Sequence, residues 1–355
     1  MDTNILVIGT GTIGEPLIGL LCSLRESLGF DSVTFYKHTP RLTDRATVLS
    51  LMKRGALVAA DPNKISIFRK QGIDVTYELE EAIDRAAVII DCTPESFGLK
   101  NKEIYYQHHE STTRGFIAQG SEFGFGKMFA CGINDEALVP GEDKYIHVVS
   151  CNTHNLAALI DTLALSDGGA ANLICGRFVC LRRANDISQD TGFIASPTVN
   201  THSDPDFGTH HARDAYHLFK TLGYELNLFS SAIKLNTQYM HSIWFDLTLA
   251  NPVTLDGLYR RIEANERLAV TQKTSANLVF SFGRDQGYFG RILNPAVIVL
   301  PTLQVRNERE IVGFSFTPQD GNSLLSSVAA CIWLLSPSEY QQKLKYLSQF
   351  LFPEV

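Results

Sequence analysis

The sequence predicts an α/β protein with two domains. The first is built on a parallel sheet, and the second is an α+β domain with a mixed sheet covered by helices on one face. Three observations lead to this prediction. Strands alternate with helices through the first 150 residues, a glycine-rich turn joins the first strand to the first helix, and the strand-like segments after residue 170 are separated by longer connections. We expect domains at 1–150 and 151–323, with helices of 324–355 packing back onto the first.

The first domain begins with an apolar strand, Asn4–Gly9, and continues with apolar residues at helical spacing from Ile13 to Leu28. A second strand follows at Ser32–Tyr36. Further along we expect helices around residues 43–54 and 63–71 and strands at 86–91, 115–119 and 145–150. Because strands and helices alternate, both faces of this sheet should be covered by helices.

The second domain offers strand-like segments at residues 172–181, 241–247, 296–300 and 311–317. The tail predicts one helix, with Ser336 as N-cap, Pro337 in the first turn and Glu339 completing a capping box. Its apolar stripe would consist of Tyr340, Leu344, Leu347 and Leu351. Such a stripe must pack on another element, and we expect that element to lie in the first domain.

The composition describes an ordinary globular protein. Of 355 residues, 45% are hydrophobic and 19% are charged, and the net charge of −7 comes without a Lys and Arg cluster, so we expect no nucleic-acid partner. The apolar run 324–335 is too short to span a bilayer and no signal peptide is evident, so we expect a cytoplasmic protein without a membrane partner. Seven cysteines without a C-x-x-C pair indicate reduced thiols rather than a zinc site.

Gly9, Gly11 and Gly14 form a G-x-G-x-x-G pattern between the first strand and the first helix. In that context the first glycine permits a tight turn, the second lets a pyrophosphate approach the backbone, and the third lets the helix pack close to the strand. The free N–H groups of the helix start can bind the anion. The pattern therefore predicts a dinucleotide site in a Rossmann-type domain. A glycine turn without a ligand is the alternative.

The residues after the second strand predict which dinucleotide binds. An NAD site usually has an acidic residue there for the ribose hydroxyls, but this stretch reads VTFYKHTPR, with Lys37, His38 and Arg41 and no acid. Cations suit a 2′-phosphate, so we expect NADP, alone or alongside NAD. A solvated basic loop is the alternative.

Cys151 stands in IHVVSCNTHNLAALIDTLAL, where a strand ends and a helix begins. A helix start or a nearby histidine can lower the pKa of a cysteine by roughly two units from about 8.5, which makes the thiol reactive near neutral pH. We therefore expect Cys151 to have a lowered pKa and to act as a nucleophile. A small buried hydrophobic side chain is the alternative, and we keep that interpretation for the other six cysteines.

Four histidines and three aspartates lie within residues 202–217. They are compatible with a metal site or an anion site. Because no H-x-x-x-H pair is present and adjacent histidines do not easily share one ion, we favour an anion site formed by His210, His211 and Arg213, with no metal. His241 opens a strand with apolar alternate residues, a placement that suits either a structural histidine or a site residue.

Seven stretches, taken in order, carry a family resemblance. They are GTGTIGEP at the glycine turn, CTPESFGLKNKEIY from Cys92, FIAQGSEF from Phe116, VVSCNT ending at Thr153, RRA from Arg182, THHARD from Thr209 and MHSIWFDL from Met240. Together they resemble the archaeal-type (class II) glyceraldehyde-3-phosphate dehydrogenases over nearly the whole chain. The run of VVSCNT, RRA and THHARD in that order is the most specific part of the resemblance.

The resemblance implies a role for each matched position. Cys151 would be the nucleophile and His241 the base, and Lys37 would contact the 2′-phosphate of NADP. The substrate and phosphate positions would be Thr153, Arg182, Arg183, His210 and His211. The cofactor positions would be Gly9, Gly11, Thr12, Ile13, Gly14, Lys37, Thr93, Pro94, Gln119 and Gly120.

The function expected from this resemblance is oxidation of glyceraldehyde 3-phosphate through a cysteine thioester. Hydride would pass to NADP or NAD, and phosphorolysis would give the acyl phosphate 1,3-bisphosphoglycerate. The partners would be the phosphorylated aldehyde and inorganic phosphate, in a homotetramer of glycolysis or gluconeogenesis. Two alternatives are open. One is a dehydrogenase or reductase for another phosphorylated aldehyde or semialdehyde acyl phosphate. The other is a catalytically idle dinucleotide-binding paralogue, suggested by His154, Asn155 and Ala212 beside the matched motifs.

Overall fold

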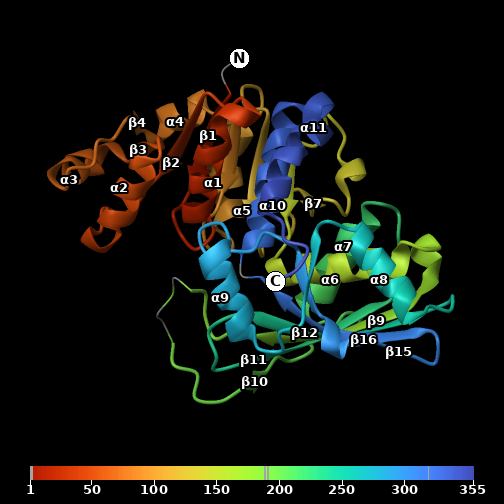
Figure 1. Cartoon of the computed structure of the whole chain (residues 1–355). Coiled ribbons are helices and arrows are strands. Elements are labelled where there is room, and N and C mark those ends of the chain that lie inside the picture. The colour runs from red at the N-terminus through yellow and green to blue at the C-terminus, as the bar shows by residue number, and fades with distance from the viewer. Residues whose placement is uncertain (1–2, 188, 190–191, 319) are drawn as a thin grey trace. The chain divides into compact units, whose positions relative to one another are not determined.

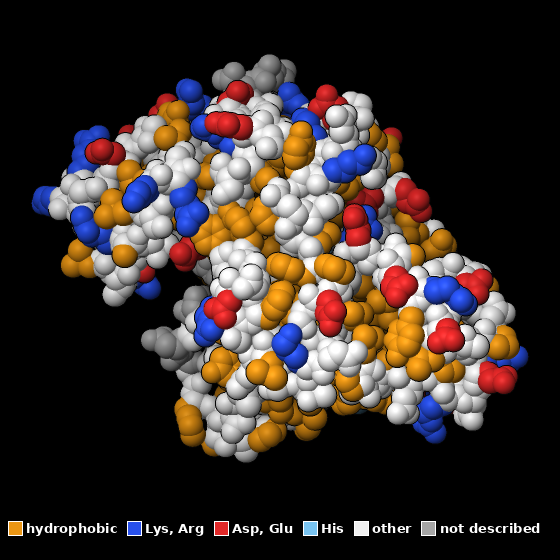
Figure 2. Space-filling view, in the orientation of Figure 1, with side chains coloured by type: hydrophobic (Ala, Val, Ile, Leu, Met, Phe, Trp, Pro, Cys, Tyr) orange, Lys and Arg blue, Asp and Glu red, His pale blue; other side chains and the backbone are white. Residues whose placement is uncertain are grey.

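A computed structural model of the chain describes residues 3–187, 189, 192–318 and 320–355 (Figure 1). These residues form two compact units. Unit 1 comprises residues 1–127, 138–148 and 326–347, and unit 2 comprises residues 128–137, 149–325 and 348–355. Among the described residues, no helix has both the length and the apolar character needed to cross a bilayer. Charges of both signs are mixed on the face drawn in Figure 2.

The sheet of unit 1 has the order β4-β3-β2-β1-β5-β6-β8-β7, and every pair from β4 to β8 is parallel. Its strands are β1 (Asn4–Ile8), β2 (Ser32–Tyr36), β3 (Leu57–Ala60), β4 (Tyr77–Glu78), β5 (Val88–Asp91), β6 (Gly115–Gln119), β7 (Lys127–Phe129) and β8 (Tyr145–Val148). The central strands are continuous apolar runs buried on both faces, as parallel strands between helices are. The predicted parallel sheet is therefore confirmed.

Helices pack on this sheet and leave the carboxyl ends of its strands for loops (Figure 1). They are α1 (Gly14–Leu28), α2 (Arg45–Lys53), α3 (Ile65–Lys70), α4 (Leu79–Arg85), α5 (Phe97–Ile104), α11 (Tyr340–Leu344) and the greater part of α10 (Gly321–Leu335). One expectation is wrong. The tail is not a single capped helix, because α11 lies between the 3₁₀ segments Pro337–Glu339 and Lys345–Phe350, and Ser336 makes no side-chain cap bond.

The sheet of unit 2 is mixed, with the order β10-β11-β9-β12-β16-β14-β13 and β15 paired to β16. Its strands are β9 (Leu173–Arg182), β10 (Thr198–Val199), β11 (Leu228–Lys234), β12 (His241–Leu249), β13 (Leu268–Thr271), β14 (Ala296–Val299), β15 (Gln304–Arg306) and β16 (Glu310–Thr317). The pairs β9–β11 and β13–β14 are parallel and the others are antiparallel. This confirms the predicted mixed sheet.

One face of this second sheet carries the core of unit 2. Along β12, alternate side chains from His241 to Leu249 are buried and those between them are half exposed. The buried face packs on α6 (Cys151–Leu159), α7 (His210–Lys220) and α8 (Leu255–Ala264), and α9 (Ala276–Gln286) completes the unit. A π-helical segment, Ile160–Leu165, continues α6. The helix that begins with Cys151 is thus held against the sheet along its length.

Candidate active site

Cys151 is the first residue of α6, and Ser150 is the N-cap of that helix. The Ser150 hydroxyl accepts a hydrogen bond from the N–H of Thr153 at 3.4 Å and lies 2.9 Å from the Thr153 hydroxyl. A serine N-cap of this kind fixes the start of a helix. The half-buried Cys151 thiol therefore lies at the positive end of the α6 dipole.

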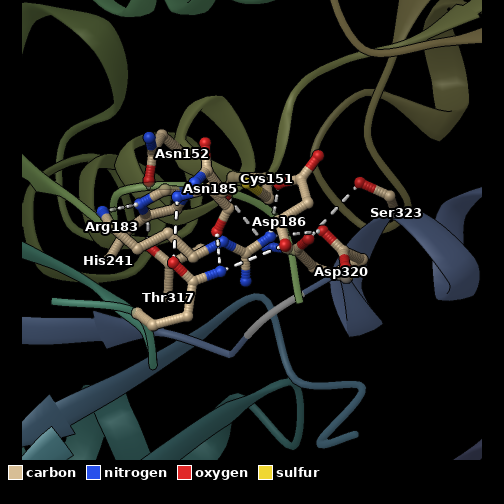
Figure 3. A network of polar contacts seen from close by, with 11 residues as sticks. Cys151, Asn152, Arg183, Asn185, Asp186, His241, Thr317, Asp320 and Ser323 are labelled. Carbon is tan, nitrogen blue, oxygen red and sulfur yellow. Dashed lines mark hydrogen bonds and ion pairs between the residues drawn. The ribbon is translucent and has the colours of Figure 1, made fainter. Parts of the chain in front are cut away.

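Other elements of unit 2 bring polar side chains to this helix start (Figure 3). Arg183 directly follows β9, His241 is the first residue of β12, and Asp320 directly precedes α10. β12 pairs with β9 on one side and with β16 on the other, where His241 lies opposite Thr317. Strand register therefore gathers residues that are far apart in the sequence at one edge of the sheet.

Arg183 is the central cation of the site, with only 2% of its side chain exposed. Its Nη2 donates to Asp186 at 2.7 Å and to Asp320 at 3.2 Å. Burial opposes the charge, but Asp320, Cys151 and Asp186 together raise the pKa of Arg183. Nε and Nη1 of Arg183 have no hydrogen-bond partner among the described residues. Buried guanidinium groups are normally fully paired, so these two donors are an exception within the part of the chain that the structure describes.

The charges around Cys151 do not activate its thiol. Burial, Asp320 and Asp186 raise the pKa of Cys151 to about 12, and Arg183 and Arg182 only partly oppose them. The expectation of a lowered pKa is therefore wrong for this structure. Its physical cause is that burial and two carboxylates outweigh the helix start and the cations, and neither carboxylate lies close to Cys151 in the sequence.

His241 is held in one tautomer. Its Nδ1 accepts a hydrogen bond from the backbone N–H of Arg183 at 3.0 Å. Burial and the charges of Arg183 and Arg182 hold its pKa well below the usual value of a histidine, so the ring is neutral. A neutral ring that accepts through Nδ1 carries its proton on Nε2. In this state His241 is a hydrogen-bond donor toward the site rather than a base.

His210 and His211 begin α7, and their ring centres lie 4.0 Å apart. Burial and the nearby Arg182 lower the pKa of His210 to about 4. Burial, His210 and Arg182 hold the pKa of His211 well below its usual value. Both ring nitrogens of His211 are buried without a partner among the described residues. Both rings are therefore neutral at neutral pH, and an anion could be bound by them only through N–H donors.

Metal binding has little support from the donor groups. In the described part of the chain, no group of three or more His, Cys, Asp or Glu side chains is arranged to hold a metal ion.

The glycine turn of unit 1 fits a dinucleotide. Gly9 has φ +99°, a conformation that favours glycine, and a Cβ at Gly14 would lie 2.2 Å from the Gly9 carbonyl oxygen. A Cβ at Gly11 would meet nothing within 4 Å, so there is empty space beside the backbone at this position. Thr12 follows Gly11, and Ile13 is the N-cap of α1. These positions match the close approach of a pyrophosphate to the backbone at a helix start.

The other cofactor candidates follow neighbouring strands of the same sheet. Lys37 follows β2, and Thr93 and Pro94 follow β5. Gln119 is the last residue of β6, and Gly120 comes directly after it. Thr93 and Pro94 line a cavity of about 390 Å³ together with Tyr36, His38, Asp61, Phe97 and Tyr105, among others. The carboxyl ends of parallel strands are where such sheets bind nucleotides.

Comparisons with known proteins identify the relatives of this chain. No family model matches it. Glyceraldehyde-3-phosphate dehydrogenase of Methanobacterium bryantii is 28% identical over 292 residues, which cover 79% of this chain and 78% of the relative. The protein of the same name from Methanocaldococcus jannaschii is 26% identical over 310 residues, 84% of each chain. This chain is a relative of the archaeal glyceraldehyde-3-phosphate dehydrogenases. The resemblance inferred from the sequence is confirmed.

Three residues that bear on the site escaped the sequence interpretation. Asp186 and Asp320 hold Arg183, and the Asn322 side chain donates to the carbonyl of Cys151 at 2.9 Å. Asp320, Gly321 and Asn322 come directly before an apolar run, which is a helix-start pattern. That pattern could have located the start of α10, but the sequence does not show that the start lies beside Cys151.

Several polar residues of α6 serve its packing. The Thr317 hydroxyl donates to Asn152 at 3.2 Å and accepts from Asn155 at 3.0 Å, and Ser315 donates to Asn155 at 2.8 Å. These bonds tie α6 to β16. Thr153, a candidate phosphate contact, is fully buried with its hydroxyl beside Ser150.

Proposed function

We propose that this chain oxidises glyceraldehyde 3-phosphate to an acyl phosphate, using NADP or NAD. The observation that carries the proposal is the site of unit 2. It combines the Cys151 thiol, the neutral His241 and two donors of buried Arg183 that have no partner in the part of the chain that the structure describes. The archaeal relatives that carry this enzyme name support the choice of substrate.

Catalysis would begin with the Cys151 thiolate attacking the aldehyde carbon, which forms a C–S bond and leaves the carbonyl oxygen negatively charged. Since Nδ1 of His241 is already an acceptor, we assign Nε2–H as the donor that stabilises this oxygen, in place of the base role that the resemblance implies. The proton of the Cys151 thiol passes to solvent before this attack, when the thiol ionises to the thiolate. A nicotinamide dinucleotide, when bound, would supply the hydride acceptor, and loss of the hydride would leave a thioester on Cys151. Phosphate attacks the thioester carbonyl, and the Cys151 sulfur departs as thiolate.

The anion contacts belong to the same site. We assign Arg183 and the His210–His211 pair to the substrate phosphate and the attacking phosphate, because these groups offer buried donors without partners or neutral imidazoles beside a cation. Arg182 adds charge, since it acts on His210, His211 and His241. Thr153 fixes the helix start beneath them.

Unit 1 would be the dinucleotide-binding domain and unit 2 the catalytic domain. The glycine turn, Lys37, Thr93, Pro94, Gln119 and Gly120 would contact the cofactor. By its resemblance to the archaeal enzymes, we extend the proposal to a cytoplasmic homotetramer of glycolysis or gluconeogenesis.

The test follows absorbance at 340 nm with glyceraldehyde 3-phosphate, either dinucleotide, and phosphate or arsenate between pH 7 and 10. Turnover that requires the aldehyde and phosphate or arsenate supports the proposal, and Cys151→Ser should abolish it. Cys175→Ser is the matched control, since Cys175 is a half-buried cysteine of β9 that contacts Thr248. Turnover with a semialdehyde phosphate alone would change the substrate assignment.

A catalytically idle dinucleotide-binding protein is the second candidate. The raised pKa of Cys151, to about 12, favours it, because almost none of the thiol is ionised at neutral pH. Dinucleotide binding without turnover at any pH up to 10 would support this candidate over the enzyme.

A further inference from the structure

The cation that the sequence assigns to a 2′-phosphate already has an anionic partner. Lys37 Nζ donates to the Asp44 carboxylate at 2.5 Å and to the Thr10 hydroxyl at 3.0 Å. Thr10 stands between Gly9 and Gly11 in the glycine turn. The ion pair therefore lies at the candidate dinucleotide site.

Asp44 reaches Lys37 because the chain turns back after β2. Residues Leu42–Asp44 form a 3₁₀ turn before α2, and the Lys37 backbone N–H is bound to Ala59 of β3 at 3.0 Å. The sheet thus fixes the backbone of Lys37, and the residue at the start of α2 supplies the Asp44 carboxylate. Seven residues separate the partners, so no acid appears in the stretch where a ribose contact is normally sought.

The Lys37–Asp44 ion pair is partly shielded from water, so it can affect the binding of another anion. Only 13% of the Lys37 side chain and 32% of the Asp44 side chain are exposed, so the ammonium is largely removed from water. Burial alone would raise the pKa of Asp44, but the hydrogen bond and charge of Lys37, with Thr43 and Arg41, lower it. Asp44 is therefore a carboxylate at neutral pH. Any further anion must compete with it for Lys37.

We propose that Asp44 determines cofactor specificity, by holding Lys37 away from a 2′-phosphate and by accepting from the 2′-hydroxyl of NAD. This rests on the proposed function, since it assumes that the glycine turn binds a nicotinamide dinucleotide. A phosphate brings negative charge next to the carboxylate and must take over the ammonium. A ribose hydroxyl brings a donor and leaves the ion pair intact. The site is thus built to admit NAD, against the preference for NADP that Lys37 alone would give.

The test measures dissociation constants of NADP and NAD by isothermal titration calorimetry on the full chain without substrate. The wild-type protein should prefer NADP by no more than about tenfold, and Asp44→Asn should tighten NADP by about tenfold or more, the usual worth of a charge-assisted bond. NAD should not bind more tightly to this variant, because the carboxylate that accepts from its 2′-hydroxyl is lost. In a Lys37→Met background the same substitution should tighten NADP by a clearly smaller factor, because only the direct repulsion between carboxylate and phosphate is relieved and there is no ammonium to release.

Asp143→Asn is the matched control, because it breaks the 2.6 Å pair with Lys127 and removes the same charge from unit 1 without involving Lys37. An unchanged ratio of the two affinities in Asp44→Asn, or an equal gain in the Lys37→Met background, overturns the inference. Absence of binding of either dinucleotide to the wild-type protein would overturn the proposed cofactor site itself. The two failures are therefore distinguishable.

Discussion

Asp320 should control how reactive the Cys151 thiol is. Its carboxylate accepts from Arg183 at 3.2 Å, leaves Oδ2 without a partner among the described residues, and is the strongest charge that raises the pKa of Cys151. Asp320→Asn keeps the size of the side chain and an oxygen acceptor for Arg183 but removes the charge. We expect the thiol pKa to fall and alkylation near neutral pH to accelerate.

The magnitude follows from Coulomb's law. Two unit charges roughly 5–7 Å apart at an effective dielectric of about 20 interact by about 2–3 kcal/mol, which corresponds to about two pKa units. The Arg183 cation screens part of this, so we expect a fall of about one unit. Below its pKa, a thiol that loses one unit has about ten times more thiolate at a fixed pH.

The assay is iodoacetamide labelling at pH 7 to 9.5, with modification at Cys151 quantified by mass spectrometry. Asp285→Asn is the control in the same unit, since Asp285 is an exposed acid paired with Arg284. Cys22, whose pKa burial raises to about 11, serves as the internal reference thiol. A Cys151 rate in Asp320→Asn that does not exceed that of the wild-type protein or of Asp285→Asn at pH 8 would refute the electrostatic argument.

Three further predictions concern the other parts of the two sites. His241→Ala should lower kcat by about 10² to 10³, the usual effect of removing one donor to the oxyanion. The wild-type pH profile should show no histidine limb between pH 5.5 and 7.5, because the depressed pKa keeps His241 neutral throughout that range. A limb near pH 6.5 that His241→Ala removes would contradict the tautomer assignment. Arg183→Lys should raise the KM for substrate or phosphate at least tenfold while dinucleotide Kd stays constant, because an ammonium cannot hold two carboxylates and an anion together. Gly11→Ala should weaken both dinucleotides at least tenfold with no loss of Tm, because the added methyl meets only the ligand's space; unchanged binding would place the ligand elsewhere.

Local patterns predicted much of the fold. The spacing of the glycines predicts the glycine turn, and the apolar composition of residues 86–91 predicts β5. Both elements lie where the sequence predicts them. β11 was missed because its segment, LFSSAIK, has a polar centre. Ser230 is fully buried there because its hydroxyl lies 2.6 Å from the Thr209 hydroxyl and accepts from Ala212 N–H at 3.0 Å. No periodicity of β11 itself could reveal partners on a helix start about 20 residues earlier.

For residues 336–351, the sequence pattern predicted more regular structure than the chain forms. The pattern of N-cap, proline and capping glutamate was consistent with one helix, yet only Tyr340–Leu344 is α-helical. Tyr340 and Leu347 are buried, while Leu344 and Leu351 are only partly so. The predicted apolar stripe therefore has two buried residues, and 3₁₀ segments lie on either side of Tyr340–Leu344. Tertiary packing decided the conformation where local propensity was weak.

The candidate dinucleotide site and the candidate active site share one feature: the cation of each is paired with a carboxylate that the sequence pattern did not predict. The sequence offers Lys37 and Arg183 as cations for phosphate groups, and the structure gives each of them a carboxylate: Asp44 for the first, Asp186 and Asp320 for the second. Asp320 lies 137 residues from Arg183, so only tertiary structure brings it there. A cation with a built-in anion binds a phosphate less strongly but is not left unpaired in the empty site, where a buried unpaired charge would be costly. A phosphate must therefore compete with Asp44 for Lys37, whereas at Arg183 it would bind beside two carboxylates that already hold Nη2. Because each carboxylate can be replaced by an isosteric amide, the strength of that competition is directly measurable at both.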